Sequence, residues 1–237
     1  MNKTIYSVII GKNYTLNEPA YITKGWKYIC YTNNYNIKSG LWDMKYITNN
    51  FGLSDLKLSR RVKIVPPFDA DLSIYLDTRF TIRQDLDRFV KRNLKHNMAV
   101  MKHNRRDCLY KEAKLLTTKD VNIAMEYRRG GMPERYGLFA PGIMIRRHTT
   151  TIAMLMDNWF YEVQRGSGRD QIALAYILWK NKYNPDLMPF RKTYREFMDK
   201  DYTIEMQSEY IGYKTRNKMY DVWLKKRMNR LKKRMNK

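Results

Sequence analysis

The chain has 237 residues and a mass of 28.7 kDa, enough for one substantial core and too little for two full domains. Its 46 Lys and Arg residues against 23 Asp and Glu give a formal net charge of +23. A field of this sign attracts polyanions, so nucleic acid or an anionic membrane surface is the expected partner. Two cysteines, Cys30 and Cys108, exclude a disulfide framework and lack the clustered spacing of a zinc site.

Apolar segments are short. The longest runs, such as Ile172–Trp179, are interrupted or flanked by charge and fall far below the roughly 20 residues that cross a bilayer. A strand-like run, Ile5–Ile10, begins within a few residues of the first Met, which leaves no room for a signal peptide. We therefore expect no integral membrane association and a cytoplasmic location.

Runs with strand character alternate with helix-compatible stretches along the chain. The early strands are expected at Tyr6–Ile10, Trp26–Tyr31, Lys63–Val65 and Leu72–Leu76, with a late strand at Gly137–Arg147. Helices are expected at Asp85–Lys95, Asp107–Leu116, Thr151–Gln164 and Asp170–Asn181. This alternation predicts an α/β protein with a layered sheet.

The last 25 residues, 213–237, hold 11 basic residues and a single acid. Leu224, Met228, Leu231 and Met235 recur at spacings of 4, 3 and 4, which predicts a basic amphipathic helix. Its apolar stripe could pack on the protein's own core, or the helix could contact nucleic acid or a membrane surface. The expected division is a domain at 1–212 and this helix at 213–237, with DNA contacts from Lys225, Lys226, Arg230, Lys232 and Lys233.

Asp77 directly follows the expected strand Leu72–Leu76. Ligands of open α/β sheets gather beyond the carboxyl ends of the strands, so this carboxylate is placed to meet one. It suits a hard divalent cation that bridges a diphosphate. Taken alone, a strand-terminal Asp is as compatible with a turn or cap.

Two further clusters combine imidazole with guanidinium. His103 precedes Arg105 and Arg106, which suits a metal or phosphate site, although a structural histidine is an equal alternative. In this segment Asp107 is placed to cap a helix that carries Glu112. The second cluster ends the late strand and contains Arg147 and His148.

The segment Ser167–Gln171 comes directly before an apolar helix. Ser167 or Asp170 could cap that helix, a contribution of about 1 kcal/mol. Alternatively, Asp170 lies at the mouth of a cleft as a general base or a ligand of a sugar hydroxyl.

In order and spacing, these segments resemble the turgor-regulation-defect-like hexosyltransferase family of plants, bacteria and phages. The similarity spans roughly residues 4 to 180 and rests on seven motifs in register: Tyr6–Gly11, Trp26–Thr32, Arg60–Pro66, Ser73–Ile82, Lys102–Ala113, Gly137–His148 and Ser167–Gln171.

The resemblance implies a GT-A-like, Rossmann-like central mixed sheet flanked by helices, a nucleoside-diphosphate sugar donor, and a divalent metal, Mn or Mg, near the strand-end acid. Asp77 resembles the first acid of the motif for metal and diphosphate, and His148 is a second expected metal ligand. The usual second acid is replaced by Arg79, which puts metal dependence in doubt because guanidinium itself neutralises a diphosphate well.

The resemblance also implies the remaining site residues. Catalytic roles are expected for Asp77, Asp170 and His103. Donor binding is expected from Gly11, Thr32, Arg60, Arg61, Lys63, Arg79, Arg106, Arg147, Arg169 and Gln171.

The net charge bears on the acceptor. A transferase of small molecules has no need of +23, whereas one that acts on DNA must hold a polyphosphate and extrude a base. We therefore expect a modified base such as 5-hydroxymethylcytosine, in a phage setting and hence in the host cytoplasm. The alternatives are a glycan or lipid-linked acceptor at a membrane face and a non-catalytic nucleic-acid-binding protein.

Overall fold

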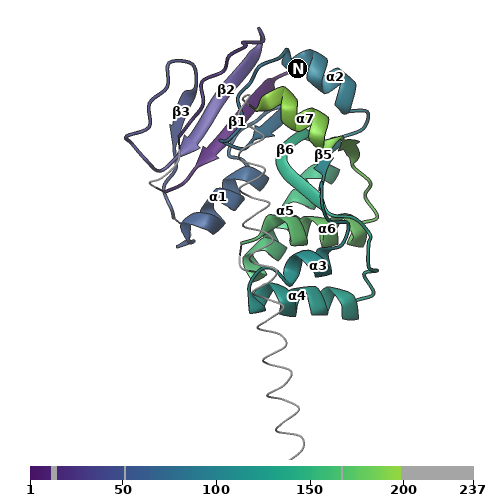
Figure 1. The fold of residues 1–237 in the computed structure, drawn as a ribbon. Coiled ribbons are helices and arrows are strands. Elements are labelled where there is room, and N and C mark those ends of the chain that lie inside the picture. Colours follow the sequence, from purple (N-terminus) through teal and green to yellow (C-terminus); the bar gives the residue numbers. More distant parts are fainter. Residues whose placement is uncertain (12–14, 51, 167, 199–237) are drawn as a thin grey trace, which may run out of the picture. The chain divides into compact units, whose positions relative to one another are not determined.

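The computed structural model describes residues 1–11, 15–50, 52–166 and 168–198, and Met1–Met198 cluster as one unit (Figure 1). The expected helix at 213–237, its DNA contacts, the boundary at 212 and Ser167 lie outside the described residues. None of the described helices combines the length and the apolar character needed to span a bilayer.

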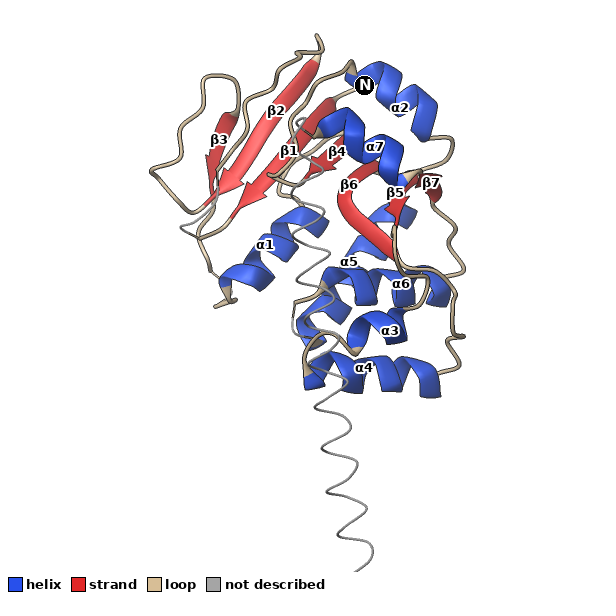
Figure 2. Cartoon of the chain, viewed as in Figure 1, coloured by secondary structure: helices blue, strands red, loops and turns tan. Residues whose placement is uncertain are grey.

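Seven strands form one sheet in the order β3-β2-β1-β4-β6-β5-β7 (Figure 2). Their bounds are β1 Lys3–Ile9, β2 Trp26–Thr32, β3 Asp43–Tyr46, β4 Leu72–Leu76, β5 Met98–Lys102, β6 Phe139–Arg147 and β7 Asp186–Met188. Strand β6 runs antiparallel to β4 and β5, and all other pairings are parallel. The carboxyl ends of six strands therefore lie at one edge of the sheet, and that of β6 lies at the other.

Helices flank this sheet. Their bounds are α1 Asp55–Ile64, α2 Leu86–Asn93, α3 Leu109–Ala113, α4 Thr118–Arg129, α5 Thr150–Arg165, α6 Asp170–Lys180 and α7 Phe190–Phe197. The large core cluster joins alternate residues of the central strands, such as Tyr6, Val8 and Tyr75, to residues of α1, α5 and α6. Helices α2 and α7 pack on each other through Phe89 and Phe197, whose ring centroids are 4.9 Å apart. The mixed sheet with flanking helices confirms the expected α/β, GT-A-like architecture.

The order of the strands creates a switch point. The chain builds outward from β1 through β2 to β3, then returns and adds β4 on the other side of β1. Connections leaving the carboxyl ends of β1 and β4 therefore diverge, and such a divergence opens the crevice where α/β sheets bind ligands.

Two expectations about local structure are wrong. Lys63–Val65 is not a strand, because α1 continues to Ile64 and Val65 alone leaves the helix, with φ −123°. The β-branched residues Ile64 and Val65 resemble part of a strand. However, Pro66 forces only the residue before it, Val65, out of helical conformation. The helix expected from Asp107 begins at Leu109, and Cys108 occupies the N-cap position without a side-chain hydrogen bond.

Candidate functional site

A pocket of about 480 Å³ lies at the switch point between β1 and β4. Its walls come from the end of β1 and the residues after it, from the first two turns of α1, and from the end of β4 and the residues after it. They are Val8, Ile10, Gly11, Asp55, Leu56, Ser59, Arg60, Tyr75, Asp77 and Thr78. A volume in this range accommodates a ligand the size of a nucleotide. The pocket is therefore the candidate functional site.

Gly11 forms the β1 wall of the pocket. Its φ of +98° is a conformation that side chains disfavour, and an added Cβ would lie 3.3 Å from Asp55 Oδ2. The Gly11 amide donates a hydrogen bond to Asn33 Oδ1 at 2.8 Å. The absence of a side chain thus lets the backbone pass close to α1 at the wall of the pocket.

The first turns of α1 form a second wall, which the sequence pattern did not reveal. Ser54 caps the helix by accepting a hydrogen bond from the Lys57 amide. The pocket residues Asp55 and Ser59 are four apart, which places both on one helical face. A Ser followed by an acid is a helix-start signal, but the apolar pattern behind it is too weak to reveal the helix.

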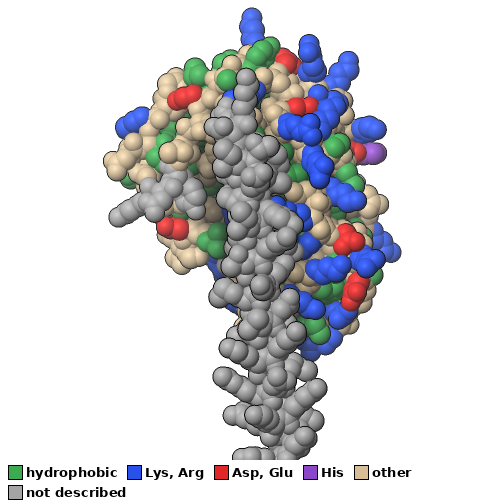
Figure 3. Space-filling model, viewed as in Figure 1, with side chains coloured by type: hydrophobic (Ala, Val, Ile, Leu, Met, Phe, Trp, Pro, Cys, Tyr) green, Lys and Arg blue, Asp and Glu red, His purple; other side chains and the backbone are tan. Residues whose placement is uncertain are grey.

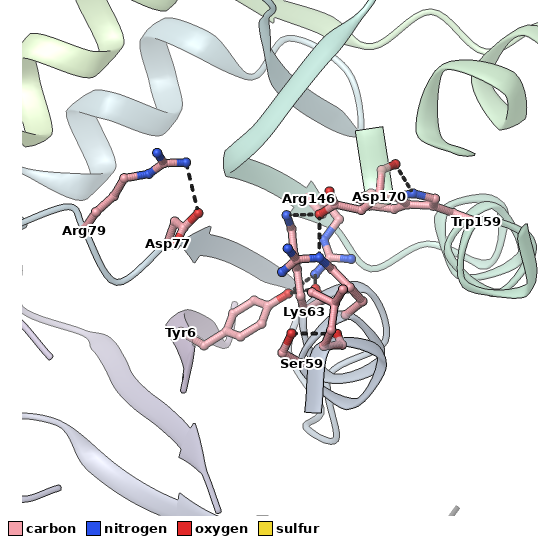
Figure 4. Close-up of polar contacts among 10 residues, drawn as sticks. Tyr6, Ser59, Lys63, Asp77, Arg79, Arg146, Trp159 and Asp170 are labelled. Carbon is pink, nitrogen blue, oxygen red and sulfur yellow. Dashed lines mark hydrogen bonds and ion pairs between the residues drawn. The ribbon is translucent and has the colours of Figure 1, made fainter. Parts of the chain in front are cut away.

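Asp77 lies where β4 ends, as expected. Its amide donates to the Gly142 carbonyl at 2.8 Å, and its carbonyl accepts from the Phe80 amide at 3.0 Å, so a turn holds its backbone. Its Oδ2 lies 3.3 Å from the Arg79 guanidinium, and the two side chains are 35% and 42% exposed (Figure 4). An ion pair this exposed contributes little to stability. The Arg79 guanidinium thus lies beside an acid of the pocket wall and is partly exposed.

Asp170 lies behind the pocket, not at its mouth. Its carboxylate forms a buried ion pair with Lys63 and lies 3.4 Å from Arg60 Nε, while Trp159 Nε1 donates to its carbonyl at 2.9 Å (Figure 4). Burial alone would raise the Asp170 pKa, but the charges of Arg60 and Lys63 outweigh it and lower the pKa to about 2. A carboxylate with so low a pKa is a poor proton acceptor at neutral pH. Asp170 therefore does not lie at the predicted cleft mouth, and its place indicates that it orients Arg60.

The carboxyl end of α1 is held by Arg146, which is 1% exposed. Its guanidinium donates to the Ile64 carbonyl at 2.6 Å and to the Tyr6 hydroxyl (Figure 4). A cation at this end of a helix is favoured by the helix dipole and satisfies carbonyls that have no helical partner. The sequence motif pointed to the neighbouring Arg147, although strand alternation turns Arg146 toward the core.

His103 follows β5 and therefore lies at the same edge of the sheet as Asp77, outside the pocket lining. Its Nδ1 accepts hydrogen bonds from the amides of Arg105 and Arg106 at 3.2 and 3.0 Å. Burial, followed by the charges of Arg106 and Arg105, lowers its pKa to about 4, so it is neutral at pH 7. Arg106 forms an ion pair with Glu112, which is 7% exposed.

His148 and Arg147 lie at the opposite edge, because they end the antiparallel strand β6. Arg147 pairs with Leu72 at the start of β4, whereas Asp77 follows the other end of that strand. Five strand residues place His148 on the order of 15 Å from Asp77. The prediction that these two residues bind one metal is therefore wrong, and Arg147 cannot reach the pocket. His148 Nε2 instead forms a hydrogen bond with Ser73 Oγ at 2.8 Å.

Among the described residues that line the pocket, the acidic side chains fit a divalent metal poorly. Asp55 and Asp77 are its acidic residues, and the guanidinium of Arg79 lies against the Asp77 carboxylate. Among the described residues, no group of three or more His, Cys, Asp or Glu side chains is placed to hold a metal ion. Hard divalent cations need several oxygen ligands, and a cation beside Asp77 would meet the repulsion of Arg79.

The other residues predicted to bind the sugar donor lie either buried below the pocket or outside its lining. Thr32 is fully buried at the end of β2, where its Oγ1 accepts from the Asn34 amide. Arg61 donates to the Val65 carbonyl at 2.7 Å and so closes the end of α1. Arg169 is the exposed N-cap residue of α6, without a side-chain cap, and Gln171 lies in the first turn. Of the ten residues predicted to bind the sugar donor, Gly11 and Arg60 line the pocket.

A comparison with protein families matches residues 63–203 to the TOD1/MUCI70 glycosyltransferase-like domain. The chain belongs to this family. The matched region includes β4 with Asp77, the segment after β5 with His103, and α6 with Asp170. No curated protein matches the chain. Membership in the family identifies the protein as a glycosyltransferase and implies a sugar donor.

Proposed function

We propose that the protein transfers a sugar from a nucleoside diphosphate donor to the hydroxyl of a modified base in DNA, such as 5-hydroxymethylcytosine. The observation that carries the donor part is the pocket at the switch point, with Arg60 on its wall and Arg79 beside Asp77. Two guanidiniums near one crevice suit a diphosphate, because each offers planar pairs of donors to phosphate oxygens.

The reaction breaks the bond between C1 of the sugar and the diphosphate oxygen, which leaves with the electron pair. The acceptor oxygen forms the new bond to C1 and loses its proton. Two groups in the pocket could take this proton, an oxygen of the departing diphosphate and the Asp77 carboxylate. Arg60 and Arg79 stabilise the negative charge that develops on the diphosphate, which is the usual large contribution of such a site.

The acceptor part of the proposal rests on charge. Residues 1–198 contain 34 Lys and Arg against 18 Asp and Glu, so the described region is strongly basic without the final segment. Binding to duplex DNA gains from release of condensed counterions for each phosphate that a cation neutralises. A base acceptor must also leave the duplex stack to enter a pocket, and backbone contacts offset that cost.

The test is incubation of the protein with a panel of nucleotide sugars and either hydroxymethylated or unmodified DNA, followed by digestion and mass spectrometry of the nucleosides. A glycosylated nucleoside from hydroxymethylated DNA alone supports the proposal. Hydrolysis of a nucleotide sugar without a DNA product would keep the donor assignment and overturn the acceptor.

The matched variants are Asp77→Ala in the pocket and Asp107→Ala, an acid outside the pocket lining whose side chain is 50% exposed. We expect Asp77→Ala to lower turnover by about 100-fold or more with the fold intact, because it removes an electrostatic group of the site. Equal turnover of the two variants would remove Asp77 from the mechanism.

A further inference from the structure

Helices α2 and α7 together present a basic surface on the face drawn in Figure 3, where Lys and Arg side chains gather over both helices. The α2/α7 surface consists of five exposed residues: Arg88, Lys91, Arg191, Lys192 and Arg195. Among the described residues, none of these five side chains has an ion-pair partner. We propose that this surface binds the phosphate backbone of the DNA acceptor, an inference that rests on the proposed function.

The acids on and beside these helices have partners other than the side chains of the five surface residues. Asp85 caps α2 by accepting from the Arg88 amide, and Asp87 pairs with Lys3. Glu196 pairs with Arg92, and Asp186 accepts hydrogen bonds from the amides of Lys95 and His96. The outward charge of the surface is therefore positive, which complements a polyanion.

The surface is rigidly attached to the wall of the site. The ring of Tyr194 in α7 packs edge-on against the ring of Phe80, with the ring centroids 4.9 Å apart. The Thr81 amide donates a hydrogen bond to the Phe197 carbonyl at 2.7 Å. The Arg79 guanidinium lies 5.9 Å from the centre of the Tyr194 ring. Helix α7 thus contacts the turn that carries Asp77 and Arg79, and these contacts connect the α2/α7 surface to the wall of the pocket.

The composition of the surface favours nucleic acid over a membrane. Both helices turn their apolar residues inward, including Phe89, Tyr194 and Phe197. None of the large exposed hydrophobic residues described lies on α2 or α7. A helix that lies in a bilayer surface needs such residues for insertion, whereas phosphate contacts need only the cations.

The test compares two variants of the full chain with equal loss of charge. The surface variant carries R88Q, K91Q, R191Q, K192Q and R195Q. The control variant carries K24Q, K27Q, K38Q, K114Q and K119Q, exposed positions outside α2 and α7. Affinity for a hydroxymethylated duplex is measured against salt concentration, together with hydrolysis of the nucleotide sugar and binding to vesicles rich in anionic lipid.

We expect the surface variant to bind DNA at least about tenfold more weakly, and its salt slope to become shallower by up to about 0.9 for each phosphate that it no longer neutralises. Its hydrolysis of the donor should match that of the parent, and the affinity of the control variant should fall markedly less. Equal falls in both variants would overturn the assignment of the surface while leaving the DNA acceptor intact. Absence of DNA binding by the parent at low salt would overturn both proposals, and vesicle binding that depends on the five residues would assign the surface to membranes instead.

Discussion

Asp170→Asn separates a structural from a catalytic role for this buried carboxylate. The change keeps the volume of the side chain and removes its charge, so the ammonium of Lys63, which is 3% exposed, loses its partner while Arg60 stays nearby. The fall of the Asp170 pKa from 3.8 to about 2 corresponds to about 2 kcal/mol in favour of the charged form. Removing one partner of a buried pair costs about 3 to 5 kcal/mol. We expect a decrease of about 3 kcal/mol in the free energy of unfolding at pH 7.

The assay is urea denaturation followed by far-UV circular dichroism, with Lys63→Met and the double variant Lys63→Met/Asp170→Asn in parallel. The double variant should recover part of this decrease, because it leaves no uncompensated charge at the pair. Since the folded-state pKa of Asp170 lies below its ordinary value, its contribution is complete above about pH 4 and disappears as the pH falls through about 2. The Asn variant should lack this acid dependence.

A helix cap would behave differently. Asn caps helices as well as Asp does, so a capping role predicts almost no change in stability. A difference below about 0.5 kcal/mol between Asp170→Asn and the parent, a range typical of surface substitutions, would refute the argument from the buried pair.

Three further outcomes are expected from the site. If guanidinium groups rather than a metal meet the diphosphate, as we propose, Arg79→Ala should reduce donor turnover more than chelation of divalent metal by EDTA does. A larger effect of EDTA in a turnover assay would contradict this. Gly11→Val should weaken binding of the nucleoside diphosphate in calorimetry by about tenfold or more, because valine strains a backbone with φ of +98° and crowds Asp55. Unchanged affinity would argue that Gly11 does not form a wall of the binding site. The free energy of unfolding should fall as the pH drops from about 6.5 toward 4, because the lowered pKa of His103 means that the unfolded chain binds the proton first. In denaturation curves, His103→Gln should make the free energy of unfolding depend less on pH in this range.

How far the sequence predicts this site depends on the direction of each strand. Asp77 could be placed because a buried strand with a clear apolar run ends directly before it. His148 ends an equally clear run, yet β6 is antiparallel and carries it to the other edge. Strand direction follows from tertiary pairing, which the local pattern of Phe139–Arg147 does not contain. The alternation of strands and helices was therefore enough to predict the architecture. It was not enough to predict that His148 and Asp77 lie at opposite edges of the sheet.

The parts that escaped prediction are those in which tertiary contacts override local preference. The end of α1 resembles a strand because Ile64 and Val65 are β-branched, but Arg146 and Tyr6 hold its last carbonyls in a helix. Misassigning this end concealed the helix and with it the pocket residues Asp55 and Ser59. Asp170 was correctly singled out, but only the fold shows that its neighbours are cations of α1 and that it is buried.

The same contacts join the buried core to the wall of the pocket. Arg60 faces the pocket from α1, Asp170 holds it from α6, and Arg146 fixes the end of α1 from β6. A diphosphate that pairs with Arg60 would therefore bind to a group whose position was set by folding and would sacrifice little side-chain freedom. Burying the ion pair between Lys63 and Asp170 costs desolvation that an apolar pair would avoid. That cost is understandable if the pair serves to orient Arg60, because an apolar replacement could fill the space but could not hold a guanidinium toward the ligand.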